Sequence, residues 1–335
     1  MRNYGLAAAV ILSAAATQAV AQDSGFEWEG ELEIGVDTTL DSETPGNEFS
    51  DTYAIVTLEA SLALGQQGFV FGTLVGESVT DATDDRAFED FGLYIEELGV
   101  GFNFGNSTVR IGKTAPTFGR TWDDGAGYFN DIVAEDYEQT EQIGVFVDTE
   151  IVPSGVLSFG VYYADDTALS RSIGEDRGRT RVSDGGAGNT GNLDNVALSW
   201  TQEFGDTSIQ VGARHLSAGE GDLSDETGFV ASAGHSFGNG LDVFAELASF
   251  DGFGGAGTDV TYATITGAYA VGDYAFSAGL AVRDDAAAGE TNVVSLGVDY
   301  EFANGIALGS GLAFVDDAGT DETLFGVSVV VPFGG

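Results

Sequence analysis

Carboxylates dominate the side chains of this sequence that can do chemistry. The 335 residues contain 54 Asp and Glu against 11 Lys and Arg, with two His and no Cys, so the formal charge is −43. A surplus of this size attracts cations, and adjacent carboxylates supply the oxygen ligands that calcium favours. Electrostatic attraction and calcium coordination are therefore the chemistry to consider first.

Adjacent acids recur in the polar segments. Calcium binding at these clusters is one hypothesis, and ordinary solvated loop acids are the alternative. The stretch GGAGTDVTY at 254–262 resembles one calcium-binding β-roll repeat, but it occurs once, so we discount it. The pairs are Asp84-Asp85, Asp123-Asp124, Asp165-Asp166, Asp284-Asp285 and Asp316-Asp317.

No set of residues indicates catalysis. His215 and His235 are the only histidines, and both fall on the apolar parity near the ends of expected strands. The one Gly-x-Ser-x-Gly match, GHSFG at 234–238, runs into the hairpin turn expected at 237–240 rather than into a helix, and the sequence has no His-Glu-x-x-His and no phosphate loop. We predict no enzymatic activity, no required cofactor and no nucleic-acid partner.

The acids are arranged with the period of a β-strand. The stretch FEWEGELEIGVD at 26–37 alternates between an apolar face and an acidic face, and a period of two is the strand period. The apolar face consists of Phe26, Trp28, Leu32 and Ile34. The acidic face consists of Glu27, Glu29, Glu31 and Glu33.

The first 21 residues have the pattern of a secretory signal peptide. Arg2 precedes the apolar run at 5–16, which is too short to span a bilayer, and Ala19-Val20-Ala21 forms a small-x-small cleavage site. We predict an exported mature chain, 22–335, forming one domain. It contains no cysteine and does not depend on disulfides, and it has no later apolar run of 18 or more residues.

Alternation continues to the C-terminus and predicts 16 strands. Short Gly-, Asn- or Asp-containing turns alternate with longer polar connections, the last two of which are 285–289 and 317–320. The parity changes inside 89–104, so we expect a β-bulge near Glu96-Glu97. The strands are expected at 26–40, 52–64, 68–79, 89–104, 107–115, 139–151, 155–166, 192–204, 207–217, 226–237, 240–251, 258–271, 273–284, 290–302, 305–316 and 321–333.

A membrane barrel explains these strands better than a soluble sandwich. They average about 13 residues, whereas strands of globular proteins usually have about 5 to 6. Long tilted strands, short turns at one end, long loops at the other and aromatic residues at strand ends are typical of outer-membrane barrels. Because lipid offers no hydrogen bonds, such a sheet must close.

With these features the chain resembles the general porins of the Gram-negative outer membrane, nearest the 16-stranded alphaproteobacterial type. The resemblance covers 22–335 and rests on strand count, loop asymmetry and the stretch at 107–147, STVRIGKTAPTFGRTWDDGAGYFNDIVAEDYEQTEQIGVFV. It implies a homotrimer in outer-membrane lipid and lipopolysaccharide, with short periplasmic turns and longer extracellular loops. It also implies a third loop, 116–138, that folds into the barrel. One departure is that Gly334 and Gly335 follow Phe333, where members usually end on the aromatic residue.

A pore of this kind selects solutes through the charges at its constriction. Parity places the acidic face of 26–37 in the lumen, where it either favours cations or keeps the inner face soluble. For the acids named below, the alternative is an exposed acidic loop; for the bases, the alternative is local ion pairing with an acid. The expected acidic side of the constriction consists of Asp123, Asp124, Asp131, Glu135 and Asp136. The expected basic side consists of Arg110, Arg214 and Arg283.

Four of the ten bases of the mature chain lie in one loop, 167–191. They allow binding of lipopolysaccharide phosphates, folding over the mouth of the barrel, or neutralisation of nearby acids. The sequence does not choose among these. The four bases are Arg171, Arg177, Arg179 and Arg181.

The expected function is passive diffusion of small hydrophilic solutes and ions through an outer-membrane channel with a mild preference for cations. A channel selective for sugars or an anion is the nearest alternative. A sugar channel would need inward aromatic residues, for which Tyr94, Phe146 and Phe244 are candidates, and an anion channel would need more wall bases. A secreted acidic calcium-binding β-protein is the alternative from another class.

Overall fold

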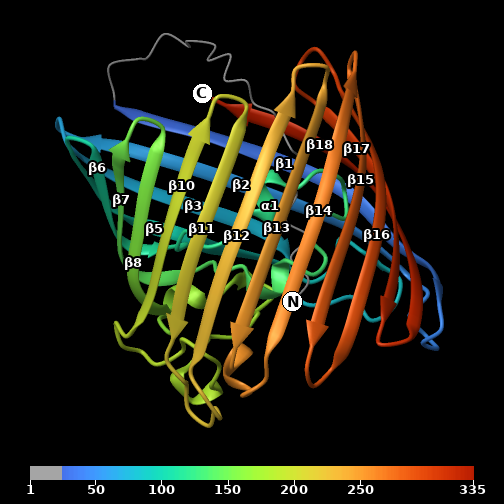
Figure 1. The fold of residues 1–335 in the computed structure, drawn as a ribbon, viewed down its shortest axis with the longest axis horizontal. Coiled ribbons are helices and arrows are strands. Elements are labelled where there is room, and N and C mark those ends of the chain that lie inside the picture. The colour runs from blue at the N-terminus through green and yellow to red at the C-terminus, as the bar shows by residue number, and fades with distance from the viewer. Residues whose placement is uncertain (1–24) are drawn as a thin grey trace.

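The computed structural model describes residues 25–335, so the predicted signal peptide, 1–21, lies outside the described residues. Within them, 16 long antiparallel strands form one closed barrel (Figure 1). The strands are β1 (Phe26–Ser42), β2 (Ser50–Leu64), β3 (Gly68–Ser78), β5 (Phe91–Phe104), β6 (Ser107–Thr114), β7 (Gln142–Val152), β8 (Gly155–Ala164), β10 (Asn195–Phe204), β11 (Thr207–Leu216), β12 (Glu226–Phe237), β13 (Leu241–Asp251), β14 (Val260–Val271), β15 (Tyr274–Asp285), β16 (Gly289–Glu301), β17 (Ala307–Asp317) and β18 (Thr320–Gly334).

The first and last strands close the ring. β1 pairs with β2 on one side and with β18 on the other, with Ile34 opposite Val329 in the second pairing. Every strand therefore has two neighbours, which satisfies the backbone groups that an open edge would leave unpaired. The predicted all-β fold and its strand count are confirmed.

The outer and inner faces of the barrel differ as lipid and water require. Outward residues of the central strands are apolar and exposed, with Phe229 and Leu247 each 60% accessible. Their neighbours on the inner face include small polar residues such as Ser199 and Ser232, which are buried. This distribution is the reverse of a soluble protein and is typical of a barrel that faces lipid.

Aromatic rings gather where strands meet the short turns. Tyr300 lies 4.7 Å from both Tyr274 and Phe302, measured between ring centroids, and Trp28 lies 6.2 Å from Phe333. Rings of this kind stabilise the interface between lipid and water. The short turns lie along the upper rim in Figure 1, and the longest loops lie along the lower rim.

The predicted bulge is present in β5. Thr73 of β3 is opposite Glu97, but the next residue, Leu74, is opposite Ile95, so Glu96 is the extra residue. An extra residue reverses the parity of everything beyond it. Phe91 and Leu98 therefore both remain on the outer face, where they are about 40% exposed (42% and 40%).

Two connections at the long-loop end are shorter than the sequence indicated. The connection expected at 285–289 has three residues between β15 and β16, and the one expected at 317–320 has two between β17 and β18. Ala318 and Gly319 have φ of 52° and 87°. Positive φ at both central residues is the geometry of a tight type I′ hairpin, which alternation alone does not reveal.

Short elements fill the remaining loops. β4 (Arg86–Ala87) pairs with β2, and β9 (Ile173–Gly174) pairs with β5. The helical segments are α1 (Thr121–Asp124) and the 3₁₀ turns at Glu135–Tyr137, Ala168–Ser170, Val182–Asp184 and Phe253–Gly255. None of these described helices is long and apolar enough to cross a membrane.

Candidate functional site

The candidate site is the passage through the barrel, and the loop at 115–141, here called the inserted loop, shapes it. The inserted loop carries α1 and lies within the outline of the barrel in Figure 1. Its side chains and backbone bond to β1, β11, β13, β14 and β15. These contacts place the inserted loop across the lumen.

An apolar seat holds the inserted loop against one side of the wall. Phe118 and Tyr137 of the loop pack on Phe250, with ring centroids 6.0 and 5.6 Å apart, and Tyr137 also packs on Tyr262 at 4.9 Å. Burying apolar side chains between loop and wall stabilises this position by roughly 1.5–3 kcal/mol for each large residue. The inner face of β12–β18 is apolar here because it is covered by protein rather than water.

Glu246 of β13 joins the two arms of the inserted loop. Its carboxylate accepts bonds from the backbone N–H of Arg120 at 2.9 Å, from Thr121 Oγ1 at 2.8 Å and from Tyr137 Oη at 2.7 Å. The side chain is only 2% exposed. Three donors on one buried carboxylate fix the two ends of the loop relative to the wall.

Glycines on the opposite strands make room for the tip of the loop. Tyr128 donates to Asp37 Oδ1 at 2.8 Å, and its hydroxyl lies 2.8 Å from that of Tyr53. A Cβ on Gly326 would lie 2.1 Å from the Tyr128 ring, and a Cβ on Gly311 would lie 2.7 Å from Tyr128 Cβ. Only glycine permits this close approach, and it brings the loop tip to β1 and β2.

Two of the predicted loop acids are held by arginines. Asp124 lies 2.7 Å from Arg120 Nη1, one turn earlier in the loop. Asp136 lies 3.2 Å from Arg283 Nη1 of β15, so the predicted meeting of loop and wall occurs here as a direct ion pair. Burial raises the pKa of both carboxyl groups, and the neighbouring arginines oppose this rise.

The other predicted loop acids have different environments. Asp131 is 2% exposed, and burial raises the pKa of its carboxyl group to about 8. Glu135 is half-buried, and Asp123 is exposed. The pKa of Asp123 is raised by burial of its carboxyl group and by repulsion from Asp124 and Glu246. Asp123 is thus an exposed predicted acid that forms no ion pair among the described residues.

Each of the three predicted wall bases already has an acidic partner. Arg110 lies 3.2 Å from Asp148 and is partly exposed. Arg283 has Asp136, described above. Both bases line the passage, but a neighbouring acid compensates the charge of each. This arrangement matches the alternative of local ion pairs.

Arg214 lies beneath the inserted loop rather than in the open passage. Its Nε donates to Glu226 at 2.8 Å, its Nη1 donates to the Tyr137 carbonyl at 2.5 Å, and the side chain is 3% exposed. The guanidinium also lies between the rings of Phe118 and Phe250, at 4.6 and 4.7 Å. Its contacts assign it to supporting the loop.

The glutamates of β1 become progressively more buried along the strand. Glu27 and Glu29 are exposed, Glu31 is half-buried, and Glu33 is 3% exposed and accepts a bond from Tyr53 Oη at 2.8 Å. The strand thus passes under the tip of the inserted loop. Its first acids border the open lumen near the short-turn end.

Sequence reasoning missed the carboxylates that the bulge contributes. Glu97 accepts a bond from Thr114 Oγ1, and Glu96 interacts electrostatically with Glu97, Glu138 and Glu141. Burial, with repulsion from Asp123, raises the pKa of Glu138 to about 7. A change of parity in the sequence indicates the bulge, but it does not show that the bulge turns two consecutive acids toward the passage.

The inward aromatic residues are covered. Tyr94, Phe146 and Phe244 do face inward, yet they are 4%, 3% and 4% exposed. Phe244 lies under the Arg120 guanidinium, 5.3 Å from it. They form no open aromatic track along the passage.

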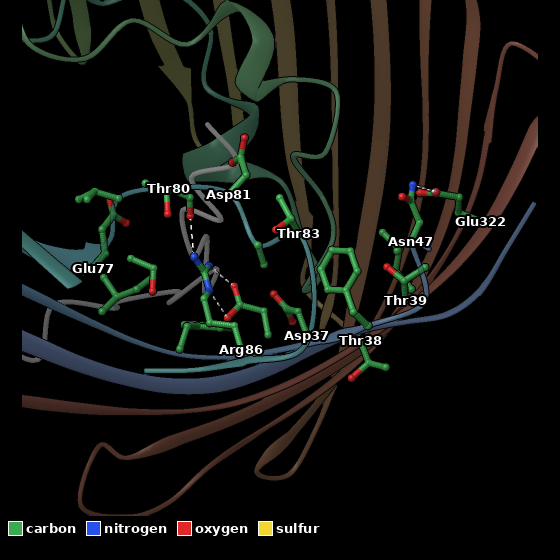
Figure 2. Close-up of a pocket in the computed structure, with 18 of the residues that line it drawn as sticks. Asp37, Thr38, Thr39, Asn47, Glu77, Thr80, Asp81, Thr83, Arg86 and Glu322 are labelled. Carbon is green, nitrogen blue, oxygen red and sulfur yellow. Dashed lines mark hydrogen bonds and ion pairs between the residues drawn. The ribbon is translucent and has the colours of Figure 1, made fainter. Parts of the chain in front are cut away.

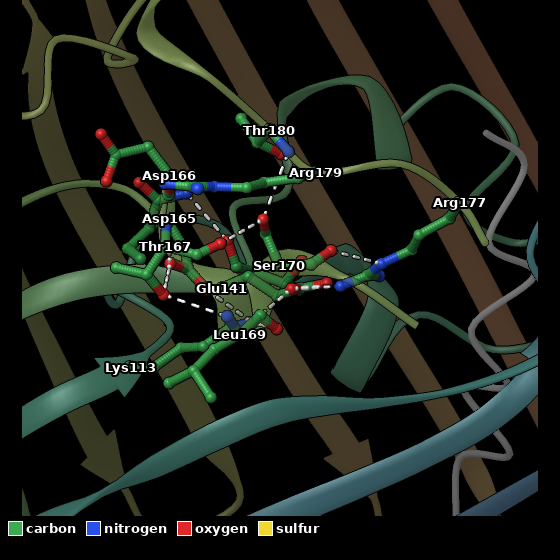
Figure 3. Close-up of polar contacts among 12 residues, drawn as sticks. Lys113, Glu141, Asp165, Asp166, Thr167, Leu169, Ser170, Arg177, Arg179 and Thr180 are labelled. Carbon is green, nitrogen blue, oxygen red and sulfur yellow. Dashed lines mark hydrogen bonds and ion pairs between the residues drawn. The ribbon is translucent and has the colours of Figure 1, made fainter. Parts of the chain in front are cut away.

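The loop at 165–194, here called the wall loop, completes the barrel where β6 stops. β6 pairs with β5 only up to Leu98, and β9 of the wall loop pairs with β5 further on, at Gly92 and Leu93. Figure 3 shows the polar cluster that fixes it. Lys113 Nζ, 1% exposed, lies 2.6 Å from Glu141 and 2.9 Å from Asp165.

One arginine of the wall loop folds inward and the others do not. Arg177 Nη2 lies 2.6 Å from Glu141, and its guanidinium stacks 3.7 Å from the Tyr94 ring. Arg171 is exposed and pairs with Asp176 at 3.3 Å, and Arg179 donates to the Asp166 carbonyl. Arg181 is exposed. Arg171 and Arg177 thus each neutralise a nearby acid.

The hypothesis of calcium at the loop acids stays a prediction. Among residues 25–335, no group of three or more acidic or histidine side chains is arranged to hold a metal ion. The paired acids are used in part for loop structure, since Asp85 accepts the backbone N–H of Ser50 at 2.9 Å and Asp316 accepts that of Gly319 at 2.8 Å.

Solved structures similar to this one include porins and an outer-membrane channel, DcaP of Acinetobacter baumannii. OprB of Pseudomonas putida aligns with a TM-score of 0.67 and 11% identity, over 92% of this chain and 94% of that one. An anion-selective porin from Comamonas acidovorans aligns at 0.61 and 16%, over 93% and 100%. A variant of the Rh. blastica porin aligns at 0.61 and 18%, over 92% and 100%.

No protein-family model and no curated protein sequence matches the chain. The structural likeness confirms the predicted porin-type barrel. Because an anion-selective porin shares this fold, the barrel does not determine the sign of the ion preferred. That must come from the lining.

Proposed function

We propose that this protein forms a water-filled channel in the outer membrane of a Gram-negative bacterium, through which small hydrophilic solutes and ions diffuse passively with a mild preference for cations. The barrel supplies width and a polar inner face, and the inserted loop narrows the passage. No chemical step is required, and the charged lining acts at the constriction.

The observation that carries the cation preference is the imbalance of charge along the passage. Arg110 and Arg283 each lie at an acid, whereas Glu96 and Glu138 have no ion pair with a base among the described residues. An excess of carboxylates raises the local concentration of cations and lowers that of anions.

The test is the reversal potential of the purified mature protein in a planar bilayer with a KCl gradient. We expect stepwise conductance and a potential that favours potassium. The double variant Glu96→Gln with Glu138→Gln should reduce this preference, whereas Asp206→Asn, in an exposed turn outside the passage, should leave it unchanged. Steps with chloride preference would contradict the cation preference, and absence of steps from folded protein would contradict the channel.

The resemblance to porins also leads us to propose a homotrimer in contact with lipopolysaccharide. The exposed Arg171 and Arg181 of the wall loop are the residues we would expect to approach lipid phosphates. Chemical cross-linking of native membranes tests the trimer.

A further inference from the structure

A cavity of about 410 Å³ lies between the inserted loop and the wall formed by β1–β3 (Figure 2). Phe129 of the inserted loop and Arg177 of the wall loop border it, and the loop between β3 and β5 lines another side. Its wall residues come from the ends of strands next to the long loops, so a solute entering by that side reaches the cavity before the constriction. The volume is within the range of small-molecule sites.

The lining of this cavity is amphipathic. Apolar side chains, among them Phe49, Ile55 and Leu324, offer surface for a carbon skeleton. Hydroxyl groups of Thr39 and Thr80 lie among them. A bare metal ion would leave most of this surface unused, so the lining fits an organic solute with several hydrogen-bonding groups.

The two bases of the cavity are already engaged. Arg86 pairs with Asp51 and, at 3.3 Å, with Asp90, and its Nη1 donates to the Thr80 carbonyl at 2.7 Å. Arg177 is bound to Glu141, as described above. Neither guanidinium is left to attract an anion.

Two carboxylates of the cavity are bonded only to neutral donors. Glu322 accepts from Ser42 Oγ at 2.9 Å and Asn47 Nδ2 at 3.0 Å, and Glu77 accepts from Tyr94 Oη at 2.5 Å. Neither forms an ion pair with a base among the described residues, although the charge of Arg177 acts on Glu77 from a greater distance. Figure 2 places them at opposite ends of the cavity, so negative charge borders both ends.

From this geometry we propose that the cavity is a binding site for small organic cations that carry an amino group and several hydroxyl groups, of about the size of an amino sugar. The ammonium binds at Glu322 or Glu77, the hydroxyl groups bond to the threonines, and the carbon skeleton contacts the apolar side chains. This proposal rests on the proposed function in that the cavity is taken to lie on the diffusion path.

The test compares three probes of equal ring size by calorimetry on the purified full-length barrel. Glucosamine is a cation, glucose is neutral and glucuronate is an anion. We expect glucosamine to bind about tenfold more tightly than glucose, as one charge-assisted hydrogen bond implies, and glucuronate to bind least. Glu322→Gln and Glu77→Gln, made separately, should each remove most of the advantage of glucosamine, while Asp206→Asn retains it.

Equal binding of glucosamine and glucose, or tighter binding of glucuronate, overturns the proposal. So does an unchanged preference in both Gln variants, provided that their KCl conductance shows intact channels. Calorimetry needs no conduction, so binding of glucosamine by a protein without conductance would contradict the channel and leave the site standing. Conductance without selective binding of glucosamine would support the channel and contradict the binding site.

Discussion

Among single residues, Glu246 fixes both arms of the inserted loop to the wall. Its carboxylate accepts donors from both arms of the loop. Hydrogen bonds to a charged group contribute about 1.5–3 kcal/mol each, and a glutamine offers one acceptor oxygen where the glutamate has two.

We predict that Glu246→Gln loosens the loop without opening the barrel. Amide hydrogen exchange within 118–137 should become about 10- to 100-fold faster, corresponding to the loss of one such bond, while exchange in the strands is unchanged. Glu301→Gln, at an exposed strand end, is the matched control. Equal protection of the loop in both variants would show that the apolar seat alone holds it.

A second residue-scale prediction concerns pH. The pKa of Glu138 is raised to about 7 by burial and by repulsion from Asp123, so this group is mostly neutral below pH 6 and mostly charged above pH 8. The cation-to-anion permeability ratio should therefore rise between these values, by roughly twofold, since one charge about 8 Å away in water contributes about 0.5 kcal/mol. Burial raises the pKa of Asp131 to about 8, so ionisation of this group also increases the cation preference as the pH rises.

The measurement is the reversal potential in a KCl gradient as a function of pH. Glu138→Gln should reduce the rise, and Asp206→Asn should not. A permeability ratio that falls with increasing pH, or a rise of equal size in the Glu138 variant, would assign the titration to other groups.

At the scale of elements, the glycines of β17 and β18 determine where the loop tip lies. Gly326→Ala would place a Cβ 2.1 Å from the Tyr128 ring, so the ring must leave and give up its bond to Asp37. We predict a displaced tip and a changed single-channel conductance. Gly267→Ala, whose nearest contact would be 3.4 Å, is the matched control and should conduct as the natural protein does.

Elements also show what the sequence can and cannot predict. Strands such as 207–217 and 226–237 were located within a residue because alternation reports directly which face meets lipid. The bulge in β5 followed from a parity change. In contrast, β9 has two residues and no periodicity, and its place beside β5 depends on where β6 leaves the wall.

The candidate site was predictable to a smaller degree. Parity correctly indicates that Arg214 faces inward, but not that Glu226 and the Tyr137 carbonyl bind it there. Such partners are set by strand register and by a loop that folds back from far along the chain. Sequence therefore identifies which side chains face inward, and only the three-dimensional arrangement shows which charges remain uncompensated.

At the scale of the whole molecule, the outer face determines stability in lipid. Leu247 lies in the middle of β13 and is 60% exposed on that face. Leu247→Arg should destabilise the barrel folded in phospholipid vesicles by about 2–4 kcal/mol, because a charge near the midplane must be desolvated. Urea titration of folding measures this, and Asn239→Arg, in an exposed turn, should cost little.

Most bonding partners of the inserted loop lie late in the chain, so the loop cannot reach its final position until late in assembly. Bonds link residue 120 to 246, residue 126 to 266 and residue 136 to 283. During assembly the tip of the loop can meet Asp37 and Tyr53 of β1 and β2, but its two arms lack their partners until β13–β15 are in place. The lumen therefore reaches its final width only after those strands have joined the sheet.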